Sequence, residues 1–373
     1  MSKLDELIAE LCPDGVEFVE LNEVLDYEQP TKYIVKSTNY DDSYTIPVLT
    51  AGQSFVLGYT NEDFGIYKAS PDSPVIIFDD FTTSFHWVDF NFKVKSSAMK
   101  MLRSKDNEIA NLRFLFHLMK NINYIPVDHS RQWIGKYSKF RIPLPPLAVQ
   151  QEIVRILDNF TELTAELTAE LTAELTARRK QYEYYRDLLL TFDEDVPKVR
   201  LDKVTTITRG VRVVKSQLTE TGTYPVFQNS MTPLGYYEKS NFNKNTVFII
   251  GAGAAGETGY SKIDFWAADD CYCLTCSDRL QSRFLYYAIL CQKSYLLSRV
   301  RRASVPRLAR SVIERVEIPV PPLKEQERIV SILDRFDALC NDLTSGIPAE
   351  IEARQKQYEY YRDKLLSFKE VTA

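Results

Sequence analysis

The stretch Ile142-Pro-Leu-Pro-Pro-Leu147 opens the segment that decides the fold, and Gln150-Gln-Glu-Ile-Val-Arg-Ile-Leu-Asp158 continues it. Glu-Leu-Thr-Ala repeats then run from Glu162 to Ala177. From Leu147 to Phe192 the sequence contains no Gly or Pro, which predicts one long helix entered at the Pro-Pro pair. A helix of about 45 residues would be about 70 Å long, so it needs an equally long surface to pack on.

The whole segment occurs twice. Ile318-Pro-Val-Pro-Pro-Leu323 copies the proline entry at an offset of 176 (318 minus 142), and Gln357-Tyr-Glu-Tyr-Tyr-Arg-Asp363 copies Gln181-Tyr-Glu-Tyr-Tyr-Arg-Asp187 at the same offset. The preceding segments also correspond, since Tyr224-Pro-Val-Phe227 echoes Ile46-Pro-Val-Leu49. The sequence therefore predicts a tandem duplication of a globular unit followed by a long helix.

Composition bounds the class of protein. The 373 residues are 45% hydrophobic and 26% charged, which is typical of a folded chain with about two domains. No run of about 18 uncharged apolar residues occurs, and the first eleven residues are acidic and amphipathic, so we expect a cytoplasmic protein. The net charge is -5, yet residues 200–317 carry 17 basic and 10 acidic side chains, which indicates a cationic second unit.

Both globular segments have a mixed α/β pattern. Strands are expected at 44–49, 74–78, 90–94 and 98–102, and one helix at about 107–120. We expect residues 1–141 to form an N-terminal helix and the first globular domain, and 142–192 the first long helix. Residues 193–317 should form the second domain and 318–373 the second long helix.

Two equally long helices can pack on each other if a pseudo-twofold axis makes them antiparallel. The alternative is that each helix packs on its own globular unit. Leu163, Leu167, Leu171 and Leu175 recur every four residues, so their stripe should spiral around the helix by about 40° per repeat. In the second copy, Gly346 and Pro348 should interrupt or kink the helix.

The duplicated proline entries, the repeat tract and the Tyr-x-Tyr-Tyr-Arg-Asp ends resemble the specificity (S) subunit of a type I restriction-modification system. The resemblance implies two target recognition domains separated by two antiparallel helices, each domain reading one half of a bipartite double-stranded DNA sequence. It further implies that the helices set the spacer and dock two modification (methyltransferase) subunits, which restriction (translocase-nuclease) subunits can join. The chain itself would be no enzyme, and S-adenosylmethionine would bind to the methyltransferase subunit. The interruption at Gly346 departs from a continuous second helix.

Basic residues near the proline entries are the candidates for DNA contact. A single surface Arg is usually only solvated, but five Arg between 299 and 310 favour phosphate contact or bidentate guanine recognition. The candidate DNA-binding residues are Lys68, Arg131, Lys136, Arg209, Arg212, Lys262, Arg299, Arg301, Arg302, Arg307 and Arg310. Gln53, Gln228 and Asn229 are weaker candidates for adenine contact.

Aliphatic residues of the long segments are the candidates for the contact between the helices and for subunit docking. These residues are Leu147, Ile153, Ile156, Leu157, Leu163, Leu167, Leu171, Leu175, Leu323, Ile329, Ile332 and Leu333. A duplicated scaffold that joins other proteins through its helices is the alternative function, and salt-dependent DNA binding would separate the two.

Two other motifs suggest ligands but favour structural roles. Gly251-Ala-Gly-Ala-Ala-Gly256 follows a predicted strand, yet a dinucleotide site needs a helix at the third Gly, and here strand or turn is expected. Cys271 and Cys273 alternate on a predicted strand without a second Cys/His pair at zinc-like spacing, so no metal site is expected. His86, His117 and His129 have no evident catalytic partner.

Overall fold

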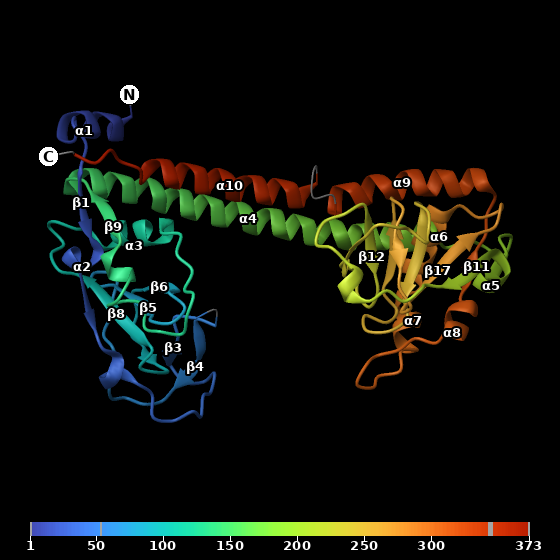
Figure 1. The fold of residues 1–373 in the computed structure, drawn as a ribbon, viewed down its shortest axis with the longest axis horizontal. Helices are drawn as coiled ribbons and strands as arrows, with labels where there is room; N and C mark the ends of the chain where they lie inside the picture. Colours follow the sequence, from blue (N-terminus) through green and yellow to red (C-terminus); the bar gives the residue numbers. More distant parts are fainter. Residues whose placement is uncertain (1, 53, 342–345, 372–373) are drawn as a thin grey trace. The chain divides into compact units, whose positions relative to one another are not determined.

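The computed structural model describes residues 2–52, 54–341 and 346–371. It divides into two compact units, residues 1–168 with 353–373, and residues 169–352 (Figure 1). No helix in the described part of the chain combines the length and the apolar character that a membrane span requires. Gln53 lies outside the described residues.

The first unit contains nine strands among its described residues. They are β1 (Glu17–Glu20), β2 (Leu25–Glu28), β3 (Ile46–Leu49), β4 (Val56–Thr60), β5 (Val75–Asp79), β6 (Phe85–Val88), β7 (Lys93–Val94), β8 (Met99–Ser104) and β9 (Arg141–Leu144). Its short helices are α1 (Lys3–Leu11), α2 (Leu21–Val24), η1 (Pro30–Tyr33), α3 (Leu112–Asn121) and η2 (Tyr137–Lys139). The strands form three sheets in the orders β2-β8-β5-β6, β4-β3-β7 and β1-β9.

The second unit repeats this plan. Its strands are β10 (Lys198–Arg200), β11 (Thr205–Arg209), β12 (Tyr224–Phe227), β13 (Gly235–Tyr237), β14 (Thr246–Ile250), β15 (Thr258–Ser261), β16 (Trp266–Ala267), β17 (Cys271–Cys276) and β18 (Glu317–Pro319). Its short helices are α5 (Leu201–Val204), η3 (Lys215–Gln217), α6 (Ser282–Cys291), α7 (Lys293–Ser298) and α8 (Arg310–Glu314). The sheet orders β11-β17-β14-β15, β13-β12-β16 and β10-β18 match those of the first unit, which confirms the predicted duplication in mixed α/β form.

The long helices follow the sequence prediction closely. One helix, α4 (Leu147–Leu189), has 43 residues and contributes to both units. The second copy consists of α9 (Leu323–Asn341) and α10 (Ile347–Leu365), so the predicted interruption near Gly346 is confirmed. Residues 342–345 lie outside the described residues. Pro348 occupies the first turn of α10, where its missing N–H costs no helical hydrogen bond.

Two local predictions need correction. The predicted helix at 107–120 begins only at Leu112, because the Asn111 side chain caps it by accepting the N–H groups of Arg113 and Phe114. The predicted strand at 90–94 is reduced to the two residues of β7.

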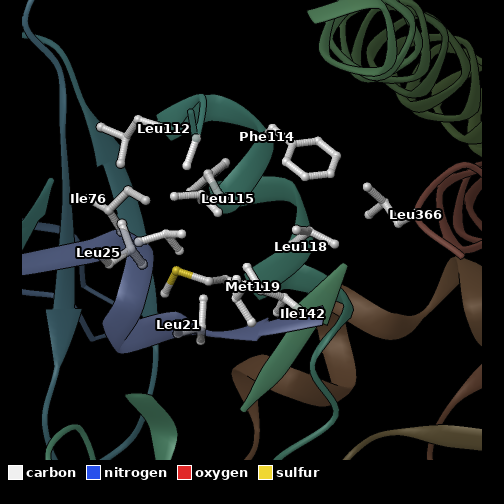
Figure 2. Packing of buried hydrophobic residues seen from close by; sticks show 14 of the residues in the cluster. Leu21, Leu25, Ile76, Leu112, Phe114, Leu115, Leu118, Met119, Ile142 and Leu366 are labelled. Carbon is white, nitrogen blue, oxygen red and sulfur yellow. The ribbon is translucent and has the colours of Figure 1, made fainter. Parts of the chain in front are cut away.

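The core of the first unit lies between its sheet and its helices. Figure 2 shows Leu112, Leu115 and Met119 of α3 pointing toward Ile76 and Leu25 of the sheet. The other side of α3 presents Phe114 and Leu118 toward Leu366, which follows α10 (Figure 2). Helix α3 therefore joins the sheet to the long helices of its unit, and α6 has the corresponding place in the second core.

Candidate nucleic-acid interface

In the first unit, Arg131 and Lys136 are exposed and lie on one loop, residues 128–136, which we call the first loop. The loop contacts the turn that follows the central strand β5. Asp80 in this turn accepts the Gln132 N–H through its main-chain oxygen at 2.7 Å and the Trp133 N–H through Oδ1 at 2.8 Å. The loop is therefore anchored to the end of the central strand.

The Asp80 carboxylate is buried and faces two cations. Its Oδ2 lies 3.2 Å from the Nζ of buried Lys100 and 3.7 Å from Nη1 of Arg131, whose side chain is 51% exposed. The Lys100 ammonium also lies 4.5 Å from the ring centroid of Tyr27. Arg131 thus has a counter-ion beneath it while the rest of its guanidinium can meet a ligand.

Hydrogen bonds within the first loop hold its shape. The buried Gln132 amide donates to Asp128 Oδ1 at 3.1 Å and to the Ser130 carbonyl at 2.7 Å, and its Oε1 accepts from the Tyr124 hydroxyl. Asp128 also lies 3.3 Å from Lys136 Nζ. Hydrogen bonds from Ser130, Gln132 and Lys136 hold the pKa of the Asp128 carboxyl well below its usual range, so the loop keeps this anion at neutral pH.

In the second unit, residues 299–308 form the corresponding loop, which we call the second loop. Arg301 and Arg307 exchange backbone hydrogen bonds across it at 2.8 and 3.1 Å. The end of the second loop is fixed to residues 251–256, which we call the Gly-rich turn. Gly253 N–H donates to the Pro306 carbonyl, and Leu308 N–H donates to the Gly251 carbonyl.

Backbone geometry places Arg131 and Arg307 at equivalent positions. The residue after each Arg donates its N–H to the first residue of the turn that ends the central strand, Asp80 in one unit and Gly251 in the other. Arg131 and Arg307, which the sequence places before the two proline entries, therefore lie at matching places in the two units.

Further candidate residues of the second unit gather at this end of the sheet. Arg209 donates from Nε to the Asp269 carbonyl at 2.6 Å, and the neighbouring Asp270 carbonyl accepts the Gly251 N–H. Arg212 is exposed three residues beyond Arg209.

Of the remaining candidates, Arg299 and Arg302 lie in the second loop and the others lie elsewhere. Arg299 stacks on Tyr295 with its guanidinium carbon 5.3 Å from the ring centroid, Arg302 is exposed at the tip of the second loop, and Arg310 pairs with Glu314 at 2.8 Å. Lys262 follows β15 and so lies at the opposite end of that strand from the Gly-rich turn. Lys68 is exposed between β4 and β5.

The Gly-rich run has the structure expected from the sequence. Strand β14 is followed by a turn and then by β15, so the predicted absence of a helix at the third glycine is confirmed. Gly253 has φ +82°, and a Cβ there would lie 2.6 Å from the Asn229 carbonyl oxygen. These glycines therefore permit close approach between the turn and neighbouring backbone.

The paired cysteines are part of a packed strand. Cys271 and Cys273 are both buried in the small core beneath β17, as the alternation predicted. Burial raises the pKa of the Cys271 thiol to about 12, so it is an uncharged apolar group at neutral pH. Within the described residues, no group of three or more His, Cys, Asp and Glu is placed to hold a metal ion.

The long helices contact each other within each unit through aromatic side chains. The rings of Phe160 and Tyr361 lie 6.1 Å apart in the first unit, and those of Tyr185 and Phe336 lie 6.0 Å apart in the second. Thr161 Oγ1 also lies 3.0 Å from the Tyr358 hydroxyl. In the first unit Phe160 of α4 meets Tyr361 and the following Thr161 meets the earlier Tyr358, so α4 and α10 run antiparallel there.

These aromatic residues were missed among the candidates, although the sequence held a signal for them. The two aromatic pairs are copies of one another at the offset of 176, with the partners exchanged between helices. The predicted aliphatic residues have a different place. Ile153 and Leu157 are fully buried in the core of the first unit, and Ile329 and Leu333 in that of the second. The long helices therefore pack on each other through one part of their length and on their own globular units through another part.

The other predicted aliphatic residues are less enclosed. Leu163 is 59% exposed and Leu323 is 46% exposed, whereas Leu175 packs against the second core. Residues that are partly buried are Leu147, Ile156, Leu167, Leu171 and Ile332.

Each unit is joined to its long helix by a partly exposed Arg–Asp contact that the sequence did not reveal. Arg113 Nε donates to Asp158 Oδ1 at 2.9 Å, and Arg283 Nε donates to Asp334 Oδ1 at 2.7 Å. His117 also lies 2.9 Å from Asp158, so this histidine has a structural partner.

A buried glutamine makes a second such contact in each unit. Gln150 donates to the carbonyls of Ile109 and Pro145 and accepts the Asn111 N–H at 2.8 Å. Gln326 repeats all three contacts, with the carbonyls of Arg279 and Pro321 and with the Gln281 N–H. The glutamine three residues after each proline entry therefore satisfies backbone groups at the start of the long helix and near the start of α3 or α6.

Known proteins share this sequence and fold. Residues 13–177 and 193–353 match the type I restriction modification DNA specificity domain. The chain is 41% identical to the type I restriction enzyme EcoR124I/EcoR124II specificity subunit of Escherichia coli, over 99% of this chain and 97% of that protein. It is 33% identical to a putative type I restriction enzyme specificity subunit, S.HindORF215P, of Haemophilus influenzae, over 95% of this chain and 96% of that protein.

Solved structures agree at the level of the fold. A chain from a study of complex assembly and conformational transition of the type I R-M system has a TM-score of 0.64 at 20% identity, covering 95% of this chain and 98% of that one. The crystal structure of a type I restriction-modification S subunit from M. genitalium has a TM-score of 0.54 at 16% identity, covering 94% and 96%.

Proposed function

The chain belongs to the type I restriction-modification DNA specificity family, and from this premise we propose that each of its two units reads one half of a bipartite target. As a specificity subunit it recognises DNA and is not itself an enzyme, because in this family catalysis belongs to partner subunits. The domain limits follow the duplication, with recognition domains in 1–141 and 193–317 and helices in 142–192 and 318–373.

One observation carries the proposal for the DNA contact. In both units an exposed Arg, Arg131 or Arg307, follows the same backbone contact at the end of the central strand. Arginine recognises guanine edges and phosphates bidentately. We assign DNA contact to the loops that carry these residues, together with Arg209, Arg301 and Arg302.

Adenine methylation by the assembled complex tests the function directly. The isolated chain should bind no S-adenosylmethionine and methylate no DNA, whereas the chain mixed with its cognate modification subunits should methylate a bipartite sequence. S-adenosylmethionine is expected on the methyltransferase subunit, and the complex is expected to act on DNA in the cytoplasm. Methylation by the chain alone would refute the proposal. A scaffold without DNA contact would show no steep fall in DNA affinity between low and moderate salt.

The helices are proposed to dock two modification subunits, which restriction subunits can join. Exposed apolar side chains on the long helices support this, since Tyr184 is 65%, Leu188 54% and Tyr360 63% exposed. Replacing Tyr184 and Tyr360 by Ser should weaken binding of the modification subunits in sedimentation experiments. Replacing the exposed Ile125 by Ser, in a globular segment, is the control that should leave assembly intact.

The length of α4 is proposed to set the spacer between the half-sites. Deleting Glu170–Ala173 removes about 6 Å of helix, on the order of two base pairs. A methylome of cells that carry the deletion should show both half-sites unchanged and a shorter spacer. Replacing the same four residues by alanines keeps the length and should keep the spacer. A changed half-site with an unchanged spacer would contradict this assignment.

A further inference from the structure

The buried Asp80–Lys100 ion pair of the first unit is replaced in the second unit by Gly251 and Tyr272 at the equivalent positions. We propose that Asp80 and Lys100 position Arg131 for DNA recognition, and that this pair determines how strictly the first unit discriminates its half-site. The inference rests on the proposed function, because it names the positioning residues beneath one of the proposed DNA-contacting loops.

Asp80 is linked to three consecutive residues of the first loop. Its main-chain oxygen accepts the Gln132 N–H, its Oδ1 accepts the Trp133 N–H, and its Oδ2 lies 3.7 Å from the Arg131 guanidinium. The side chain is 1% exposed, so it cannot itself reach DNA. It can act only through the loop that it holds.

Lys100 fixes the Asp80 carboxylate from the interior. Its Nζ lies 3.2 Å from Asp80 Oδ2, and its side chain is 1% exposed. Without this cation, the Asp80 carboxylate would be buried without its nearest counter-ion, which carries a large desolvation cost. The pair therefore keeps a negative charge directly under an exposed arginine.

The second unit shows that the fold itself does not require the pair. Strand pairing places Lys100 opposite Phe78 and Tyr272 opposite Ile249, so Tyr272 takes the place of Lys100. Gly251 takes the place of Asp80. Asp80 N–H donates to the carbonyl of Ala98, two residues before Lys100, and Gly251 N–H donates to the carbonyl of Asp270, two residues before Tyr272. The same backbone is thus built without charge, as expected where apolar replacements of buried ion pairs keep stability.

The same unit contains a matched control. Lys93 Nζ lies 3.0 Å from Glu62 Oε2, with side-chain exposures of 0% and 8%, and it also donates to the Phe64 carbonyl. This pair belongs to the β4-β3-β7 sheet and its connections, whereas Asp80 and Lys100 belong to the sheet that contains β5 and β8. Neutralising either pair removes one buried ion pair and leaves the net charge unchanged.

The experiment compares D80N/K100M with E62Q/K93M in the full chain assembled with its modification subunits. Binding is measured to duplexes with an intact first half-site, an altered first half-site or an altered second half-site. D80N/K100M should lose about tenfold or more of its discrimination at the first half-site only. Its logarithmic salt slope should become shallower by about one ionic contact. E62Q/K93M should keep both properties within about twofold.

A second variant acts on the loop from its solvent side. Asp128→Asn weakens the contacts to Ser130 and Lys136 without entering the core. Removal of a carboxylate would by charge alone tighten DNA binding. A positioning role instead predicts weaker discrimination at the first half-site in spite of the added net positive charge.

The inference is overturned if the two double variants lose discrimination equally, or if D80N/K100M discriminates as the parent chain does. If D80N/K100M does not fold, Asp128→Asn decides, and unchanged discrimination in that variant overturns the inference. A parent complex that binds neither half-site specifically would instead refute the proposed function.

Discussion

In the first unit, side chains anchor the proposed DNA-contacting loop, whereas in the second unit backbone groups do so. The buried Asp80–Lys100 pair holds the first loop from the protein interior. Gln132 holds it through hydrogen bonds within the loop. The second loop is held by its own Arg301–Arg307 pairing and by Gly251 and Gly253. Strand order and pairing are the same in both units, so the duplicated scaffold tolerates two unrelated ways of fixing the residues at its tip.

This comparison separates residues that maintain the shared scaffold from residues that distinguish the units. Gln150 and Gln326 make the same three backbone contacts, and the Arg113–Asp158 contact has its copy in Arg283–Asp334. Equivalent substitutions of these scaffold residues should destabilise the two units equally. Substitutions around the loops should affect one unit and leave the other unchanged.

The largest expected effect is on the first unit alone. Asp80→Asn without a change at Lys100 leaves a buried ammonium unpaired, which should cost about 3–5 kcal/mol of stability. Hydrogen exchange should speed up in β5 and β8 but not in β14 and β17. If the unpaired ammonium is the cause, adding K100M to D80N should return the exchange rate toward that of the parent chain. An unchanged fast exchange in D80N/K100M would contradict this explanation.

The next effect should be the same in both units. Gln150→Leu and Gln326→Leu each remove the partner of three backbone groups, so each should cost about 3 kcal/mol. Exchange of α3 should respond to the first substitution and exchange of α6 to the second. Markedly unequal losses would mean that the two proline entries are not energetically equivalent.

A smaller effect is expected on the second unit alone. Gly253→Ala forces a side chain into a left-handed backbone with φ +82° and toward the Asn229 carbonyl, at a cost of about 1–3 kcal/mol. Gly135→Ala in the first loop is the control, because the nearest atom to its Cβ is the Arg131 carbonyl oxygen at 4.0 Å. Proteolysis of the second loop should increase in the first variant and stay unchanged in the control.

The smallest effect concerns pH. Burial lowers the pKa of His117 below its usual 6.5 in spite of Asp158, and Arg113 and Lys120 lower it further. The unfolded chain therefore binds the proton first, so stability is present above about pH 6.5 and falls as the pH is lowered, by at most about 1.4 kcal/mol per pH unit.

Hydrogen exchange of α3, corrected for intrinsic rates, should reveal this loss between about pH 7.5 and pH 5.5. Helix α6 has Tyr287 at the corresponding contact with Asp334, and burial raises the pKa of this tyrosine, so α6 should show no such loss. His117→Gln should abolish the pH dependence in α3. Equal acid sensitivity of α3 and α6 would exclude His117 as its source.

Much of the architecture could be predicted from the order of residues. The ungapped copies at an offset of 176 identified two units and two long helical segments, and the break near Gly346 followed from the backbone preferences of Gly and Pro. These features depend on local propensity and on repetition, which are written along the chain. The correspondence of Arg131 with the cluster before the second proline entry was visible for the same reason.

The contacts that fix the proposed DNA-contacting loops were decided by the tertiary structure. Asp80, Lys100 and Arg131 come from a turn, a strand and a loop that are far apart in the sequence. Strand pairing brings Lys100 to Asp80, and hydrogen bonds from Gln132 and Trp133 bring Arg131 there. The helix contacts were likewise assigned to leucine and isoleucine side chains, while the fold placed Ile153 and Leu157 in a core and brought Phe160 and Tyr361 together. Sequence periodicity shows which face of a helix is apolar, but only packing determines what that face meets.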